Sequence, residues 1–176
     1  MDRASDAEII REVLAGGRQR YSVLVERHGP ALLAWLARRA GPEEAAELLQ
    51  ETLVRAYERL GELREATRLR SWMLSIAQNL AAQGRRRPAP LPLEAAGDSP
   101  GAPAASAALE AGEERARIER ACARLPERQR EVFEMRVLAN LAHAEIAALL
   151  GIREDASRAS YYQALRKLRA ELEDEA

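Results

Sequence analysis

Residues 141–168 read LAHAEIAALLGIREDASRASYYQALRKL, and this stretch has the pattern of a helix-turn-helix. An apolar helix is followed by Leu150-Gly151-Ile152 and then by a second, more polar helix. The small side chain of Ala147 would let the two helices cross closely, and Gly151 can take the backbone conformation that a tight turn demands. A helical hairpin with a solvated outer face has the same spacing, so the pattern alone leaves open whether the stretch binds DNA.

The second helix of this stretch has two distinct faces. Its apolar residues repeat at intervals of four, three and four, and we expect them to face the core: Tyr161, Leu165, Leu168 and Leu172. The residues predicted to face outward are Arg158, Tyr162, Gln163 and Arg166. Arginine can fork onto guanine, glutamine can pair with adenine, and cations such as Arg166 can neutralise phosphate. The outward face therefore has the donors that a DNA major groove requires.

Helix signals also recur before this stretch. Ser5 and Glu8 have the spacing of a capping box, and Pro42 is typical of a first helical turn. A helical pattern that begins at Tyr21 is interrupted at Gly29-Pro30 and then resumes. The further ranges with helical apolar spacing are 31–40, 42–60, 71–84, a segment ending near 125, 126–138, 141–150 and 154–172.

Composition favours helices over strands and divides the chain. Hydrophobic residues make up 47% of the chain, largely as alanine, while aromatic residues make up 4% and β-branched residues are sparse. Proline, alanine, glycine and serine dominate residues 88–112, which indicates an interdomain linker. We therefore predict an all-α protein with a domain over 1–87, this linker, and a second small domain over 113–176.

Charge, cysteine and the N-terminus limit the function classes. The net charge of −1 argues against a strong solitary DNA binder, so contact with DNA must be local or need a partner. Cys122 is the only cysteine, so no disulfide framework is available and a reducing compartment fits. With no apolar signal core or membrane-spanning run in the sequence, we expect a cytoplasmic protein without stable membrane insertion. No catalytic, metal-ligand or phosphate-binding constellation is found, so we expect no enzyme activity, metal or cofactor.

Two charged segments each allow two interpretations. Arg85, Arg86 and Arg87 could stabilise the C-terminus of a helix or contact nucleic acid. An acidic stripe that includes Glu44, Glu47 and Glu51 is often only solvated, but could also pair with an arginine-rich partner helix. Charge alone does not separate these readings.

Taken together, four stretches resemble the extracytoplasmic-function (ECF) group of sigma-70 family sigma factors, across nearly the whole chain outside the linker. They are EAAELLQE at 44–51 with RAY at 55–57, SWMLSIAQNL at 71–80, LPERQREVF at 125–133, and EIA followed by LGI within 145–152. Each stretch alone is weak, but four in this order on either side of a proline-rich linker are specific.

The resemblance implies a sigma factor that takes core RNA polymerase to specific promoters and assists their opening. Residues implied to dock on the β′ clamp helices of polymerase are Glu44, Glu47, Gln50, Glu51 and Arg55. Residues implied to open and read the −10 element are Arg64, Arg68, Trp72, Gln78, Asn79, Arg85 and Arg86. Residues implied to read the −35 element, while the second domain sits on the β flap, are Arg153, Ser157, Arg158, Tyr162, Gln163 and Arg166.

Two alternatives stay open at this point. The chain could be a sigma-like interaction module that binds polymerase or an anti-sigma partner without recognising promoters. It could also be a free-standing helix-turn-helix regulator that binds duplex DNA without polymerase. For a sigma factor of this group, we expect a separate anti-sigma protein as a partner.

Overall fold

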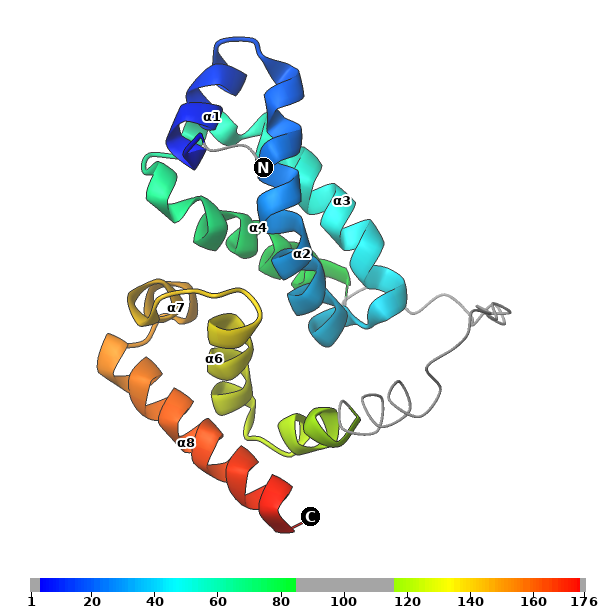
Figure 1. Ribbon diagram of the computed structural model, residues 1–176, viewed down its shortest axis with the longest axis vertical. Helices are drawn as coiled ribbons and strands as arrows, with labels where there is room; N and C mark the ends of the chain where they lie inside the picture. Colours follow the sequence, from blue (N-terminus) through cyan, green and yellow to red (C-terminus); the bar gives the residue numbers. More distant parts are fainter. Residues whose placement is uncertain (1–3, 85–115, 175–176) are drawn as a thin grey trace.

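The computed structural model describes residues 4–84 and 116–174, and the regular structure within these two ranges is entirely helical, as predicted (Figure 1). The main helices are α1 (Asp6–Leu14), α2 (Tyr21–Ala40), α3 (Pro42–Glu58), α4 (Leu69–Gly84), α6 (Glu127–Val137), α7 (His143–Leu150) and α8 (Glu154–Asp174). Short 3-10 turns are η1 (Arg18–Arg20), η2 (Leu60–Glu62) and η3 (Ala66–Arg68), and a further helix over 116–123 precedes α6.

The predicted start signals lie at the helix ends. Ser5 caps α1, because its hydroxyl accepts a hydrogen bond from the Glu8 amide at 3.3 Å while the Glu8 carboxylate accepts one from the Ser5 amide at 2.7 Å. Pro42 occupies the first turn of α3, directly after Gly41 with its φ of 95°. The capping box and the proline start are therefore confirmed.

The predicted interruption at Gly29-Pro30 is wrong, because α2 runs unbroken through Pro30. Proline has no N–H to donate to the preceding turn, so the helix is weakened there. Burial on either side compensates, since Leu24 and Leu36 are each 0% exposed and belong to the main hydrophobic cluster. Tertiary packing here outweighs a local helix breaker.

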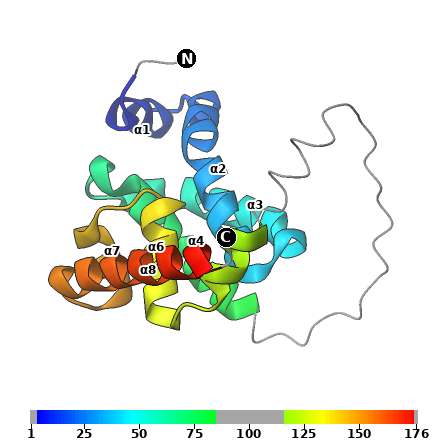
Figure 2. The same cartoon turned by 60° about the horizontal axis from the view of Figure 1, so that its bottom comes forward.

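The two halves of the chain lie against each other. Helices α1–α4 form the upper part of Figure 1 and α6–α8 the lower part, with α7 packed against α4, and Figure 2 shows the same two parts turned by 60°. Their contact is apolar, because Val132, Met135 and Ile146 belong to the same buried cluster as the core of α1–α4. The structure thus has the two helical domains predicted from the sequence, and a hydrophobic seam joins them. The predicted linker 88–112 lies outside the described residues.

Ion pairs flank this seam. Arg39 Nη2 lies 2.9 Å from Glu131 Oε1, and Arg38 Nε lies 3.5 Å from Glu134 Oε1. The Glu134 side chain is only 7% exposed. Burial raises the pKa of Glu134, although the positive charge of Arg38 opposes the effect. Sequence spacing gave no signal for these pairs, because each joins residues about a hundred positions apart.

His28 is another buried polar residue. Its side chain is 5% exposed, and Nε2 lies 2.8 Å from Asp6 Oδ2. His28 therefore packs in the core with one ring nitrogen bonded to a carboxylate. In the ranges 4–84 and 116–174, no cluster of three or more His, Cys, Asp or Glu side chains is suited to a metal ion, and no helix is long and apolar enough to span a bilayer.

Candidate nucleic-acid interface

Helices α7 and α8 form the helix-turn-helix predicted from the sequence. Gly151 ends α7 in the left-handed conformation, with φ of 63°. The turn is closed by the Ile152 amide, which donates to the Ala147 carbonyl at 3.0 Å. Ala147 is 6% exposed, as expected of a small residue where two helices cross. Gly151 thus fixes the direction in which α8 leaves the turn.

The outward face of α8 is exposed as predicted. Arg158, Gln163 and Arg166 are all exposed, and Tyr162 is 69% exposed. The inward stripe differs in one member, because Leu165 is 38% exposed while Ala164 is 0% exposed. A helical period of 3.6 residues places 157, 161, 164 and 168 on one side, so the buried stripe uses small residues that a search for large apolar side chains misses.

Acidic neighbours hold the basic side chains at the start of α8. Arg153 Nη2 lies 2.6 Å from Asp155 Oδ2, and Arg158 pairs with Glu154 one turn earlier. These side chains are largely exposed, so the pairs are weakly held and the guanidinium groups remain able to reach a DNA ligand. Gln163 accepts a hydrogen bond from Gln129 Nε2 at 2.8 Å, which ties the outward face to α6.

Ser157 requires a correction. We expected its side chain on the DNA-binding face, but it is 0% exposed. Its hydroxyl lies 3.0 Å from Nδ1 of His143, the first residue of α7. The hydroxyl therefore joins the two helices of the motif and does not reach solvent.

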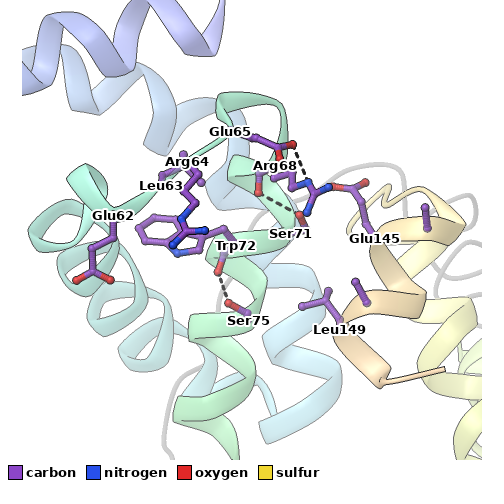
Figure 3. A pocket seen from close by; sticks show the side chains of 12 residues that line it. Glu62, Leu63, Arg64, Glu65, Arg68, Ser71, Trp72, Ser75, Glu145 and Leu149 are labelled. Carbon is purple, nitrogen blue, oxygen red and sulfur yellow. Dashed lines mark hydrogen bonds and ion pairs between the residues drawn. The ribbon is translucent and has the colours of Figure 1, made fainter. Parts of the chain in front are cut away.

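A cleft lies between the two halves (Figure 3). Its volume is about 540 Å³. One wall is the segment 62–68 together with the first turns of α4, including Arg64, Arg68 and Trp72. The other wall is α7, with Glu145 and Leu149 facing the cleft in Figure 3. The structure thus brings together three of the residues predicted for the −10 element and places part of the other half opposite them.

The other residues predicted for the −10 element do not line this cleft. Gln78 is half-buried on α4, and Asn79 is exposed one turn beyond Ser75. Arg85 and Arg86, like Arg87, lie outside the described residues. The described part of the candidate −10 surface therefore consists of the cleft and the exposed side of α4 that continues from it.

The candidate polymerase-docking residues share the exposed side of α3. Four of them are exposed: Glu44, Glu47, Gln50 and Glu51. Arg55 is half-buried and pairs with Glu51 one turn before it. Val54, which lies between Glu51 and Arg55 in the sequence, is 56% exposed, so this polar side of α3 also offers an apolar contact.

Two family models match the chain. One describes "Sigma-70 region 2" and matches residues 24–89, and the other describes "Sigma-70, region 4" and matches residues 115–168. The second match includes α7 and α8 up to residue 168, and the first includes α3 and α4. The two matches, one on either side of the predicted linker, thus show that the chain is an RNA polymerase sigma factor.

Curated relatives narrow the class. The chain is 29% identical over 155 residues to the ECF sigma factor SigL of Mycobacterium tuberculosis, which covers 86% of this chain and 88% of that protein. It is 26% identical over 92 residues to the ECF sigma-E factor of Haemophilus influenzae, a match that spans 49% of either chain. The chain belongs to the ECF subfamily of the sigma-70 family, whose members are not enzymes and direct RNA polymerase to promoters.

Solved structures have the same fold. The structure of CnrH in complex with the cytosolic domain of CnrY superposes with a TM-score of 0.72 at 23% identity, covering 98% of this chain and 100% of that one. The sigma factor RpoE in complex with the anti-sigma factor NepR, from Bartonella quintana, gives a TM-score of 0.63 at 18% identity, covering 87% of this chain and 96% of that one.

Proposed function

We propose that this sigma factor reads the −35 element with the outward face of α8. The observation that carries the proposal is the exposure of Arg158, Tyr162, Gln163 and Arg166 on the helix that Gly151 directs away from α7. In a helix-turn-helix, the second helix enters the major groove and its side chains contact base edges. Arg153 adds a cation at the start of the same helix.

The −10 element is assigned to the cleft and the exposed side of α4. Promoter opening requires no catalytic side chain, because flipping out a base costs a few kcal/mol that stacking and phosphate contacts can offset. Trp72 supplies an aromatic surface, and Arg64 and Arg68 supply cations beside it. Gln78 and Asn79 extend the surface along α4, and the assignment of Arg85 and Arg86 continues it beyond the described residues.

Polymerase is assigned to two further surfaces. The acidic face of α3, with Glu44, Glu47 and Glu51, suits the β′ clamp helices, and the C-terminal half would sit on the β flap. This division corresponds to a polymerase-docking and −10 domain over 1–87, a linker over 88–112 and a −35 domain over 113–176.

The seam between the halves supports an order of events. Helix α7 forms one wall of the cleft that holds Trp72, so access of DNA to the −10 surface is restricted while the halves are together. Polymerase would separate the halves when it binds them at two sites, and the cleft would then be open to single-stranded DNA. The net charge of −1 fits a subunit with little affinity for DNA alone.

An anti-sigma protein is proposed as a further partner. The support comes from similar folds, because the RpoE structure contains the anti-sigma factor NepR. A protein of this kind would hold the sigma factor away from polymerase. Pull-down with the purified chain, followed by competition with core enzyme, tests for such a partner.

Gel-shift assays with and without core polymerase test the proposal. A promoter fragment selected from a genomic library should be bound and opened only when both the chain and core enzyme are present. Core binding without opening would favour a sigma-like interaction module, and duplex binding without core would favour a free-standing regulator.

Arg158→Ala or Gln163→Ala should weaken −35 binding by about 1–3 kcal/mol. Arg11→Ala, an exposed arginine on α1, is the matched control and should leave it unchanged.

A further inference from the structure

His143 stands at the junction of the two helices of the motif. Nδ1 of its ring lies 3.0 Å from the Ser157 hydroxyl, which is completely buried. The ring also lies edge-on to Tyr161, with 5.6 Å between the ring centroids. Both contacts come from α8, so the imidazole of α7 is held in one orientation by the neighbouring helix.

The other ring nitrogen has a different environment. Nδ1 contacts Ser157, and Nε2 lies on the opposite edge of the ring. Among the residues that the structure describes, Nε2 has no hydrogen-bond partner. The side chain is half-exposed, and since Nδ1 faces the buried Ser157, we infer that the Nε2 edge is the one a ligand can reach. An imidazole with one nitrogen anchored and the other free presents its second N–H, when protonated, in a fixed direction.

The charges around His143 come from the candidate −35 interface and from α6. Arg158 and Glu154 act on it from α8, and Arg136 acts on it from α6. Glu145, on α7 itself, is engaged elsewhere, because its carboxylate accepts a hydrogen bond from the Ala142 amide at 2.9 Å. His143 thus shares its surroundings with Arg158, one of the residues proposed to read DNA.

We propose that His143 contacts a backbone phosphate of the −35 duplex through Nε2 and takes up a proton when it does so. The inference rests on the proposed function of α8. When the second helix of such a motif lies in the major groove, the first helix crosses the DNA backbone, and contacts to phosphate set the register of the protein on DNA. Ser157 acts as a positioning residue, which explains a buried hydroxyl in the middle of a DNA-binding motif.

The proton uptake follows from the two environments. In the free protein, burial lowers the pKa of His143, the charges of Arg136 and Arg158 lower it further, and Glu154 opposes them. An adjacent phosphate stabilises the charged form and raises the pKa in the complex. DNA binding should therefore strengthen as the pH falls through the pKa of the bound state, and level off below the pKa of the free state.

The test measures promoter affinity of the complete holoenzyme by fluorescence anisotropy, from about pH 5.5 to about pH 8. The wild-type chain should bind more tightly at the acidic end. His143→Ala should remove this pH dependence and weaken binding about tenfold at low pH. It should also reduce the slope of log K against log salt by about 0.9, the value of one phosphate contact. His143→Lys should bind tightly across the range, and Ser157→Ala should reduce the pH dependence without removing the ionisable group.

His28→Gln is the matched control, since it replaces the only other histidine, which lies buried against Asp6. It should retain the wild-type pH dependence. A wild type whose promoter affinity is independent of pH, or a His143→Ala variant that keeps both the pH dependence and the salt slope, would overturn the inference while leaving the proposed function intact. A holoenzyme that binds no promoter at any pH would overturn both.

Discussion

The two halves of the molecule bury their side chains differently. Large residues that are almost completely buried lie mainly in the N-terminal half: Trp35, Ile9, Leu24, Leu32, Leu36, Leu60, Leu69, Met73 and Leu74. The C-terminal half has a separate buried cluster that is smaller and consists partly of small side chains: Ala121, Cys122, Leu125, Ala164 and Leu168. The largest buried side chains of the C-terminal half belong instead to the cluster of the N-terminal half: Met135, Leu141 and Ile146. The C-terminal half thus depends on its neighbour for much of its apolar burial.

Core truncation should give the largest effect and should differ between the halves. Leu36→Ala, at a residue 0% exposed in the larger core, should lower the free energy of unfolding by about 2–5 kcal/mol. Leu168→Ala, at 6% exposure in the smaller cluster, should cost less, because fewer contacts are lost. Urea unfolding of both variants measures the difference. Equal losses would contradict the contrast between the two cores.

Breaking the seam should give the next largest effect. Arg39 and Glu131 are 17% and 13% exposed, so removing either partner should destabilise the protein and a double-mutant cycle should give a coupling of about 1–3 kcal/mol. Arg59 and Glu62, an exposed pair within the N-terminal half, serve as the control and should couple more weakly. Zero coupling between Arg39 and Glu131 would mean that the halves are not held together in solution.

A smaller effect is expected at the helix ends. Gly151→Ala should cost about 1–2 kcal/mol of stability, because alanine is strained at a φ of 63°. No atom lies within 4 Å of the added methyl group, so the cost is backbone strain alone. Ser5→Ala, which removes the cap of α1, should cost about 1 kcal/mol. Thermal unfolding compares the two, and a Gly151→Ala variant as stable as wild type would contradict the left-handed turn.

The smallest expected effect concerns the pH dependence of stability, which should have opposite signs at two carboxylates. Burial raises the pKa of Asp6, but hydrogen bonds and charges from Arg27 and His28 hold it below its ordinary value of 3.8, so its contribution to stability is lost as the pH falls through the folded-state value. Burial raises the pKa of Glu134 above its ordinary 4.5, so its contribution is present below that value and is lost as the pH rises through the folded-state value.

Substitution of each carboxylate should show this contrast. The stability of Asp6→Asn relative to wild type should decrease with rising pH, whereas that of Glu134→Gln should increase. Urea unfolding over a pH series measures both slopes. Slopes of the same sign would contradict a lowered pKa for Asp6 together with a raised pKa for Glu134.

Local features of the fold could be predicted from the sequence. Capping chemistry at Ser5, the proline start at Pro42 and the turn glycine Gly151 depend only on nearby residues, and the structure confirms all three. The exposed face of α8 was also predicted, because its polar side chains repeat with the helical period. Pro30 was misjudged because packing on both sides of it outweighs its local preference.

Contacts between distant segments could not be predicted. The seam joins α6 and α7 to α2 and α4 across a segment whose composition allows many arrangements, and neither Arg39 nor Glu131 has a local pattern that identifies its partner. Ser157 was expected to face DNA from the resemblance to the family, whereas in the structure it is buried and its hydroxyl contacts His143 in another helix. The role of a single residue where two helices cross can be predicted only when the geometry of the crossing is known.

The cleft in Figure 3 gives the chain its own optical probe. Of the two tryptophans, Trp35 is 2% exposed in the core, whereas Trp72 lines the cleft opposite α7. Separation of the halves would place the Trp72 indole in water while the Trp35 signal stays constant. In a Trp35→Phe variant, Trp72 is the only tryptophan left in the chain. Its fluorescence would therefore report, without an added label, when polymerase or an inhibitor separates the two halves.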